Sequence, residues 1–356
     1  MAKSKKSALQ TAKGVSSPEI TNKDSIQYLK KRRRSKIDIN ELVSAILTQD
    51  ITALSKAITL IESKKPKHLD LANALIKTCL PYANNSVRIG ITGVPGVGKS
   101  TFIEAFGNHL LSLGKRVAVL AVDPSSSLTK GSILGDKTRM VNLAKNENVF
   151  IRPSASGDTL GGVARKTRET ITLCEAAGFD VILIETVGVG QSEITVHSMV
   201  DFFLLLKLAG AGDELQGIKR GIIEMADAII INKADGGNIE AANIAKTEFN
   251  KALHLYPEKK SNWLPKVSVC SATENNGIEA IWGMILEYLD ITSKNNHFNN
   301  KRNEQDKFWL LQTVEEKLKS SFFNQEKIKT ELKKQLELLE HNKTTPFAAA
   351  DYLLSL

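Results

Sequence analysis

Residues 87–101 read VRIGITGVPGVGKST, in which an apolar run passes directly into the pattern GxxxxGKS at positions 93–100. This order is typical of a strand, a glycine-rich loop and the start of a helix, and the N–H groups of such a loop surround the phosphates of a nucleotide. The helix that begins near Lys99 adds the positive end of its dipole. Lys99 can contact the β- and γ-phosphates, and Ser100 can coordinate Mg²⁺. The stretch therefore predicts a triphosphate site.

Apolar runs recur along the chain from Val87 to about Leu289, with helical patterns between most of them. They are continuous rather than alternating, which suits a parallel sheet buried on both faces. We therefore expect an α/β fold, a P-loop NTPase with a mostly parallel doubly wound sheet. The strand-like runs are Val87–Ile91, Arg116–Val122, Val149–Ile151, Asp180–Ile184, Asp201–Leu208, Ala228–Ile231 and Lys266–Val269.

A second motif, NKxD, follows the sixth apolar run and selects the base. The Asp235 carboxylate can accept two N–H bonds from the guanine edge, and adenine lacks that pair of donors. A backbone N–H after the last run can meet the guanine oxygen, so the pattern favours GTP over ATP. The nucleotide-binding residues that we expect are Gly93, Val94, Pro95, Gly96, Val97, Gly98, Lys99, Ser100, Thr101, Gly188, Asn232, Lys233, Asp235, Ser271, Ala272 and Thr273.

Carboxylates at the ends of two other runs predict the hydrolytic centre. Glu185-x-x-Gly188 stands where common small GTPases have DxxG, so Gly188 can offer its N–H to the γ-phosphate. Asp123 directly follows the second run and Asp136 lies in the loop after it; such a cluster suits Mg²⁺, which prefers oxygen ligands. We expect Ser100, Asp123, Asp136 and Glu185 at the metal. The alternative is a turn-forming Asp-Pro for Asp123 and an ordinary loop residue for Asp136.

The net charge of +9 is concentrated at the N-terminus: residues 1–40 hold 11 basic and 3 acidic residues, a net +8. The run 30–34 could touch RNA, lipid or an acidic protein, or be a solvated arm. Since the rest is nearly neutral, we do not expect a nucleic-acid partner. No run approaches the roughly 20 apolar residues of a membrane span. Three scattered cysteines and no apolar signal segment after Met1 favour a cytoplasmic protein without a membrane partner.

Composition divides the chain of 356 residues into five parts. We expect a basic, disordered tail over 1–36, an N-terminal helical extension over 37–84, a P-loop GTPase domain over 85–291, a polar linker over 292–303 and a helical arm over 304–356. From pattern alone, the arm serves either a partner or self-association, or it packs on its own domain.

The chain resembles the methylmalonyl-CoA mutase-associated GTPases of the MeaB/ArgK type, once described as arginine/ornithine transport-system kinases. The resemblance covers about residues 40–290. The strings that carry it are GVPGVGKST at 93–101, VDPSS at 122–126, GDKTRM at 135–140, RPS at 152–154 with GGVA at 161–164, ETVGVGQSE at 185–193 and GAGDELQGIK at 210–219.

The resemblance implies a homodimeric, Mg²⁺-dependent GTPase that converts GTP to GDP and phosphate and acts as chaperone of a cobalamin-dependent acyl-CoA mutase such as methylmalonyl-CoA mutase. It would gate loading of adenosylcobalamin and protect or reactivate the mutase. Residues 304–356 would be the dimerisation arm, and the loop 210–219 a switch that brings Lys219 to the nucleotide. The implied catalytic residues are Lys99, Asp136, Glu185 and Lys219. One departure is Thr273, where the family pattern leads us to expect Leu.

Two other functions stay open. One is a transport-system-associated P-loop kinase or ATPase, as the older family name suggests. The other is a nickel-insertion-type metallochaperone GTPase, which would need a His-rich tract or a Cys/His pair for the metal; the sequence has neither.

Overall fold

A computed structural model of the chain describes residues 38–122, 140–153, 160–186, 192–210 and 220–356. The basic tail and four predicted site residues lie outside the described residues. These four are Asp123, Asp136, Gly188 and Lys219.

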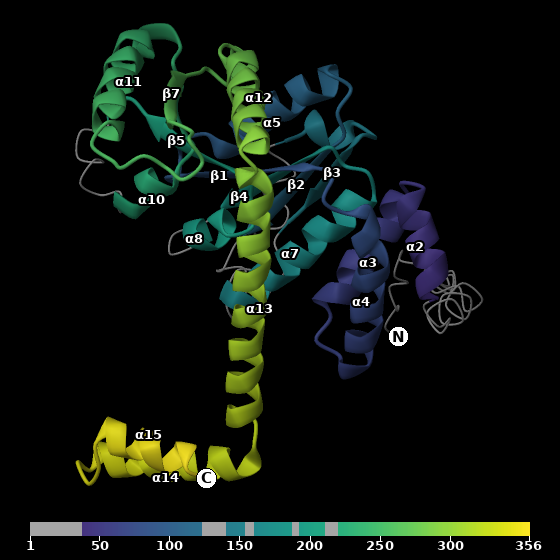
Figure 1. Cartoon of the computed structure of the whole chain (residues 1–356), viewed down its shortest axis with the longest axis vertical. Helices are drawn as coiled ribbons and strands as arrows, with labels where there is room; N and C mark the ends of the chain where they lie inside the picture. Colours follow the sequence, from purple (N-terminus) through teal and green to yellow (C-terminus); the bar gives the residue numbers. More distant parts are fainter. Residues whose placement is uncertain (1–37, 123–139, 154–159, 187–191, 211–219) are drawn as a thin grey trace, which may run out of the picture.

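A seven-stranded, all-parallel sheet forms the centre of the molecule, in the order β3-β2-β4-β1-β5-β6-β7 (Figure 1). The strands are β1 (Val87–Gly93), β2 (Val117–Val122), β3 (Val149–Arg152), β4 (Val181–Thr186), β5 (Phe202–Leu208), β6 (Ala228–Asn232) and β7 (Lys266–Val269). Each matches one of the seven apolar runs, so the predicted α/β fold is confirmed. All residues of β2, β4 and β6 are buried, as expected of strands covered on both faces.

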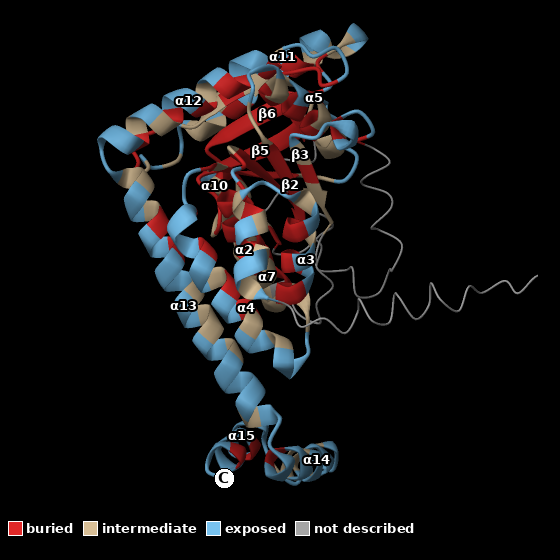
Figure 2. Ribbon diagram, turned by 90° about the vertical axis from the view of Figure 1, so that its right-hand side faces the viewer, coloured by how far each residue is buried: buried red, intermediate tan, exposed pale blue. Residues whose placement is uncertain are grey.

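Helices cover both faces of this sheet (Figure 2). Alternate strand residues point to opposite faces, and they form different clusters: α5 and α12 pack on one face, and α7, α8, α10 and α11 on the other. The bounds in the domain are α5 (Lys99–Ser112), η2 (Leu143–Lys145), α7 (Leu160–Ala176), α8 (Ser192–His197), α10 (Arg220–Met225), η3 (Gly236–Asn238), α11 (Ile239–Leu253) and α12 (Ile278–Lys294). Within the described residues, no helix combines the length and the apolar character that crossing a bilayer requires.

The N-terminal extension adds α2 (Ile39–Leu47), α3 (Ile51–Glu62), α4 (Pro66–Cys79) and η1 (Leu80–Tyr82), which pack on the outside of α7. Asp38 and Asp50 cap the first two helices by accepting backbone N–H bonds. Pro66 is the first residue of α4. Proline is tolerated there because the first N–H groups of a helix have no hydrogen-bond partner within the helix.

The C-terminal part contains α13 (His297–Phe323), α14 (Glu326–Glu340) and α15 (Pro346–Leu354). The predicted linker over 292–303 is wrong, because only Asn295 and Asn296 separate α12 from α13. Asn296 has φ 60°, a left-handed conformation that Asn tolerates and that lets the chain turn within two residues. Figures 1 and 2 show α13 leaving the domain, with α14 and α15 packed together at its far end.

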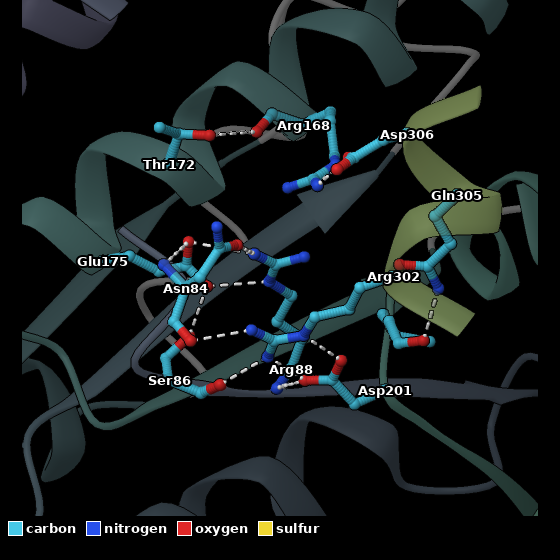
Figure 3. Close-up of polar contacts among 11 residues, drawn as sticks. Asn84, Ser86, Arg88, Arg168, Thr172, Glu175, Asp201, Arg302, Gln305 and Asp306 are labelled. Atoms are coloured by element: carbon cyan, nitrogen blue, oxygen red, sulfur yellow. Dashed lines mark hydrogen bonds and ion pairs between the residues drawn. The ribbon is translucent and has the colours of Figure 1, made fainter. Parts of the chain in front are cut away.

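A network of buried charges joins the first turns of α13 to the sheet (Figure 3). Arg302 donates from Nε and Nη2 to the two oxygens of Asp201, at 2.8 and 2.6 Å, and from Nη2 to the Ser86 carbonyl at 2.7 Å. Arg88 on β1 makes the same kind of two-bond contact with Glu175 of α7. The Arg88 backbone N–H also donates to Asp201, at 2.8 Å, so both ion pairs share one frame.

Candidate nucleotide-binding site

The glycine-rich loop between β1 and α5 depends on glycines in unusual backbone conformations. Gly96 has φ 82° and Gly98 has φ 92°, conformations that glycine adopts without strain. A Cβ on Gly93 would lie 2.6 Å from the Leu206 carbonyl oxygen of β5, so only glycine fits there. No side chain caps the N-terminus of α5. Its first N–H groups and its dipole therefore face the position where a phosphate would bind.

Lys99 lies with its Nζ at 2.7 Å from the Gly93 carbonyl and 3.4 Å from the Val94 carbonyl. Burial lowers the pKa of Lys99, while Glu185 and Glu193 act in the opposite direction and favour the charged form. Among the described residues, the hydrogen-bond partners of Lys99 are these two carbonyls. An ammonium group held in this way near carboxylates is suited to exchange the carbonyls for phosphate oxygens.

Glu185 lies where three strands meet. It is the last but one residue of β4, beside Ile91 of β1 and Ala121 of β2 in register, and it is 4% exposed. The carboxyl ends of these strands form the crevice at which ligands bind in parallel sheets. Next to it, the Thr186 hydroxyl donates to the Thr92 hydroxyl at 3.0 Å and holds β4 to β1. The structure thus places Glu185 close enough to Lys99 of the glycine-rich loop to act on its charge, and its role at a metal stays a prediction.

The described part of the predicted metal site consists of Ser100 and Glu185. A hydroxyl and a carboxylate at the mouth of the phosphate loop are oxygen donors, the type that Mg²⁺ prefers. Asp123 and Asp136 lie outside the described residues. The described residues contain no group of three or more His, Cys, Asp or Glu that could hold a metal ion. The donors that are present fit Mg²⁺, and its full ligand set stays a prediction.

The NKxD motif begins at Asn232, the last residue of β6, and continues into a tight turn. Lys233 has φ 60°, and the Ala234 N–H donates to the Cys270 carbonyl at 3.0 Å. This turn carries Asp235 to the loop that follows β7. There the Asp235 Oδ2 accepts hydrogen bonds from the Ser271 hydroxyl at 2.6 Å and from the Thr273 hydroxyl at 3.1 Å.

Asn232 connects the base loop to the phosphate loop. Its Nδ2 donates to the Val97 carbonyl at 2.9 Å, and its Oδ1 accepts from the Cys270 thiol at 3.4 Å. A Cβ on Gly98 would lie 2.8 Å from this Nδ2, so the contact also needs glycine. Two motifs that are 135 residues apart therefore lie on one crevice.

The structure brings most predicted residues together and adds three that the sequence does not single out: Thr92, Cys270 and Glu274, whose N–H donates to the Ser271 hydroxyl at 3.2 Å. Of these three, only Cys270 could have been suspected from the sequence, because it directly precedes the predicted site residue Ser271. The predicted residues that the structure describes at the crevice are Gly93–Thr101, Glu185, Asn232, Lys233, Asp235 and Ser271–Thr273.

The fold and this crevice define a P-loop nucleotide-binding protein with a separate loop for the base. Residues 54–327 match the family described as Methylmalonyl Co-A mutase-associated GTPase MeaB. The chain belongs to this family of GTPases.

Curated relatives and a solved structure support the same assignment. A probable GTPase of Mycobacterium tuberculosis is 47% identical over 89% of this chain and 95% of its own length. GTPase ArgK of Escherichia coli is 46% identical over 82% of this chain and 88% of its own. The mitochondrial methylmalonic aciduria type A homolog of Mus musculus is 41% identical over 94% of this chain and 83% of its own. A crystal structure of LAO/AO transport system kinase superposes with a TM-score of 0.73 at 37% identity, covering 90% of this chain and 99% of the other.

Proposed function

We propose that the protein binds GTP with Mg²⁺, hydrolyses it to GDP and phosphate, and uses this cycle as chaperone of a cobalamin-dependent acyl-CoA mutase. The observation that carries the nucleotide part is the Asn232–Val97 hydrogen bond of 2.9 Å, which joins a phosphate loop to a guanine-type base loop. The mutase part is supported by the family description.

In this proposal the residues of the chain bind and orient the nucleotide. Lys99 exchanges its contacts with the Gly93 and Val94 carbonyls for the β- and γ-phosphates. The N–H groups at the start of α5 neutralise charge that develops as the bond to the γ-phosphate breaks. A bound Mg²⁺ would neutralise the same charge, held by Ser100, Glu185, Asp123 and Asp136. Gly188 and Lys219 would approach the γ-phosphate end, as the resemblance implies.

We further propose that two copies associate through the arm and that the protein works in the cytoplasm. The arm is supported as an interface by exposed apolar side chains along α13, such as Leu310 at 64% and Leu318 at 63% exposure. Exposed apolar side chains in such number are typical of an interaction surface.

The chaperone proposal is tested by adding the purified protein to a cobalamin-dependent acyl-CoA mutase with GTP and Mg²⁺. We expect a changed GTP turnover rate and a changed rate of adenosylcobalamin loading, with a Lys99→Ala variant as the control whose turnover is strongly reduced. If neither rate changes while GTP still binds, the mutase role is wrong and the nucleotide site stands.

The superposed crystal structure is named a transport system kinase, and a kinase function makes a different prediction. A kinase would move the γ-phosphate to a protein acceptor, whereas a GTPase releases it to water. With γ-³²P-labelled GTP we expect the label as free phosphate. Label that stays on a protein band would favour the kinase.

A further inference from the structure

The loop after β7 is held in one conformation by its own backbone. Ser271 and Asn276 exchange both N–H···O bonds at 3.0 Å. Gly277 follows with φ 77°, and a Cβ there would lie 2.5 Å from the Val269 carbonyl oxygen. The end of the loop therefore requires glycine at this position. The side chains of Ser271 and Thr273 therefore project from a rigid support toward Asp235.

The protons in this cluster can be assigned from the distances. Ser271 lies 2.6 Å from Asp235 Oδ2, the length of a charge-assisted O–H···O⁻ bond, so the single Ser271 proton points to the carboxylate. The Ser271 oxygen is thus left to accept, and it does so from the Glu274 N–H at 3.2 Å. The Thr273 hydroxyl lies 3.1 Å from both Asp235 Oδ2 and the Ser271 oxygen. Because a carboxylate oxygen only accepts, Thr273 donates its single proton to Asp235 Oδ2, and the Ser271 oxygen can receive only a minor share of that proton in a bifurcated bond.

The Thr273 hydroxyl limits the rotation of the Asp235 carboxylate. The terminal torsion of an Asp side chain is broad, and one hydrogen bond from Ser271 leaves the carboxylate free to turn about that contact. A second donor on the same oxygen restricts this rotation. Among the described residues, Asp235 Oδ1 accepts no hydrogen bond, so the oxygen that remains open is held in one place. Preorganised groups bind more tightly because less freedom is lost on binding.

We propose that Thr273 is a positioning residue for base selection: its hydroxyl, with that of Ser271, fixes the carboxylate of Asp235 in the orientation that receives the guanine edge. This inference rests on the proposed GTP-binding function. It assigns a role to the one position of the base loop where the sequence departs from the expected Leu.

The test measures Kd values for GDP and ADP, with Mg²⁺, by calorimetry of the full chain. Thr273→Val keeps the shape of the side chain and removes the hydroxyl, and Thr273→Ser keeps the hydroxyl. We expect Thr273→Val to weaken GDP binding about three- to tenfold with the Kd for ADP unchanged, and Thr273→Ser to stay within about twofold of the original chain. Thr247→Val, on the exposed side of α11, is the matched control and should change neither Kd.

A double-mutant cycle separates action through Asp235 from a general effect. In an Asp235→Ala background, Thr273→Val should leave the Kd for GDP unchanged. The proposal is overturned if Thr273→Val binds GDP like the original chain, if it weakens GDP and ADP equally, or if its effect persists without the carboxylate. Failure of the unaltered chain to prefer GDP over ADP would instead refute the proposed function.

Discussion

At the scale of single residues, Lys99 gives the clearest prediction. Lys99→Ala removes the one side-chain charge of residues 93–100. The ammonium group that now contacts the Gly93 carbonyl is the donor that we propose for the β- and γ-phosphates. We expect the GTP hydrolysis rate to fall roughly 100- to 1,000-fold, the usual loss when such a donor is removed. Phosphate release under saturating GTP measures it. Lys77→Ala, on the exposed side of α4, is the control and should hydrolyse GTP at the original rate.

Asp235 gives a prediction about specificity. Asp235→Asn exchanges an acceptor-only carboxylate for an amide that also donates, so it no longer matches the two donors of guanine but does match the additional carbonyl of xanthine. We expect the Kd for GDP to rise roughly 100-fold or more and the Kd for XDP to fall. Calorimetry with both nucleotides checks this. A variant that still prefers GDP would contradict the role of Asp235 as base reader.

The residue scale also shows what the sequence could predict. Short motifs name Lys99, Asn232 and Asp235 because their chemistry depends on spacing within one segment. The bond from Asn232 to the Val97 carbonyl and the thiol of Cys270 behind it depend on how β6 and β7 lie beside the phosphate loop. No local pattern contains such long-range contacts, so they could not be predicted from the sequence.

At the scale of elements, the strands were predictable and the start of the arm was not. The seven runs are apolar throughout because both faces of the sheet are buried. The first turns of α13 pack through Arg302 and Gln305, its buried residues, and both are polar. Apolar periodicity therefore predicts no packing there, and the neighbouring asparagines indicate a linker where the structure has a two-residue turn.

Arg302 is expected to hold this junction. Arg302→Ala leaves Asp201, whose side chain is 1% exposed, with an uncompensated buried charge and removes donors to the Asn84 and Ser86 carbonyls. We expect the free energy of unfolding to fall by about 3–5 kcal/mol, measured by urea denaturation. Lys294→Ala breaks an exposed ion pair with Asp290 and should cost less than about 1 kcal/mol. Equal losses in the two variants would show that the buried network does not stabilise the junction.

His197 of α8 makes stability depend on pH. Burial, with Lys301 nearby, lowers the pKa of His197 to about 4, although Asp227 acts in the opposite direction. The unfolded chain binds this proton near pH 6.5 and the folded chain only near 4, so stability is present above about 6.5 and is lost as the pH falls through that window. We expect a loss of about 1–3 kcal/mol from about pH 7 to 4 that is absent in His197→Gln. A variant with the same pH profile as the original chain would contradict this.

At the scale of the whole molecule, α13 extends away from the domain (Figure 2). It bears apolar side chains that the rest of the described chain leaves exposed. Leu310 and Leu318 lie on α13 beyond the Arg302 contact, so a change there should not disturb the nucleotide crevice. Exposed apolar surface of this kind favours association by the hydrophobic effect. Whole-molecule assembly and nucleotide turnover should therefore be separable.

Replacing both leucines with glutamate tests this separation. Leu310→Glu/Leu318→Glu places charges where a second copy would bury apolar groups, and burying an unpaired carboxylate is strongly unfavourable. We expect light scattering to show a dimer for the original chain and a monomer for the double variant, with GTP hydrolysis in the absence of mutase within about twofold of the original rate. Glu316→Gln, on the same helix, is the control that should remain dimeric. A dimeric double variant would exclude this face of α13 as the interface, because a surface that tolerates two buried carboxylates cannot be the one that the association depends on.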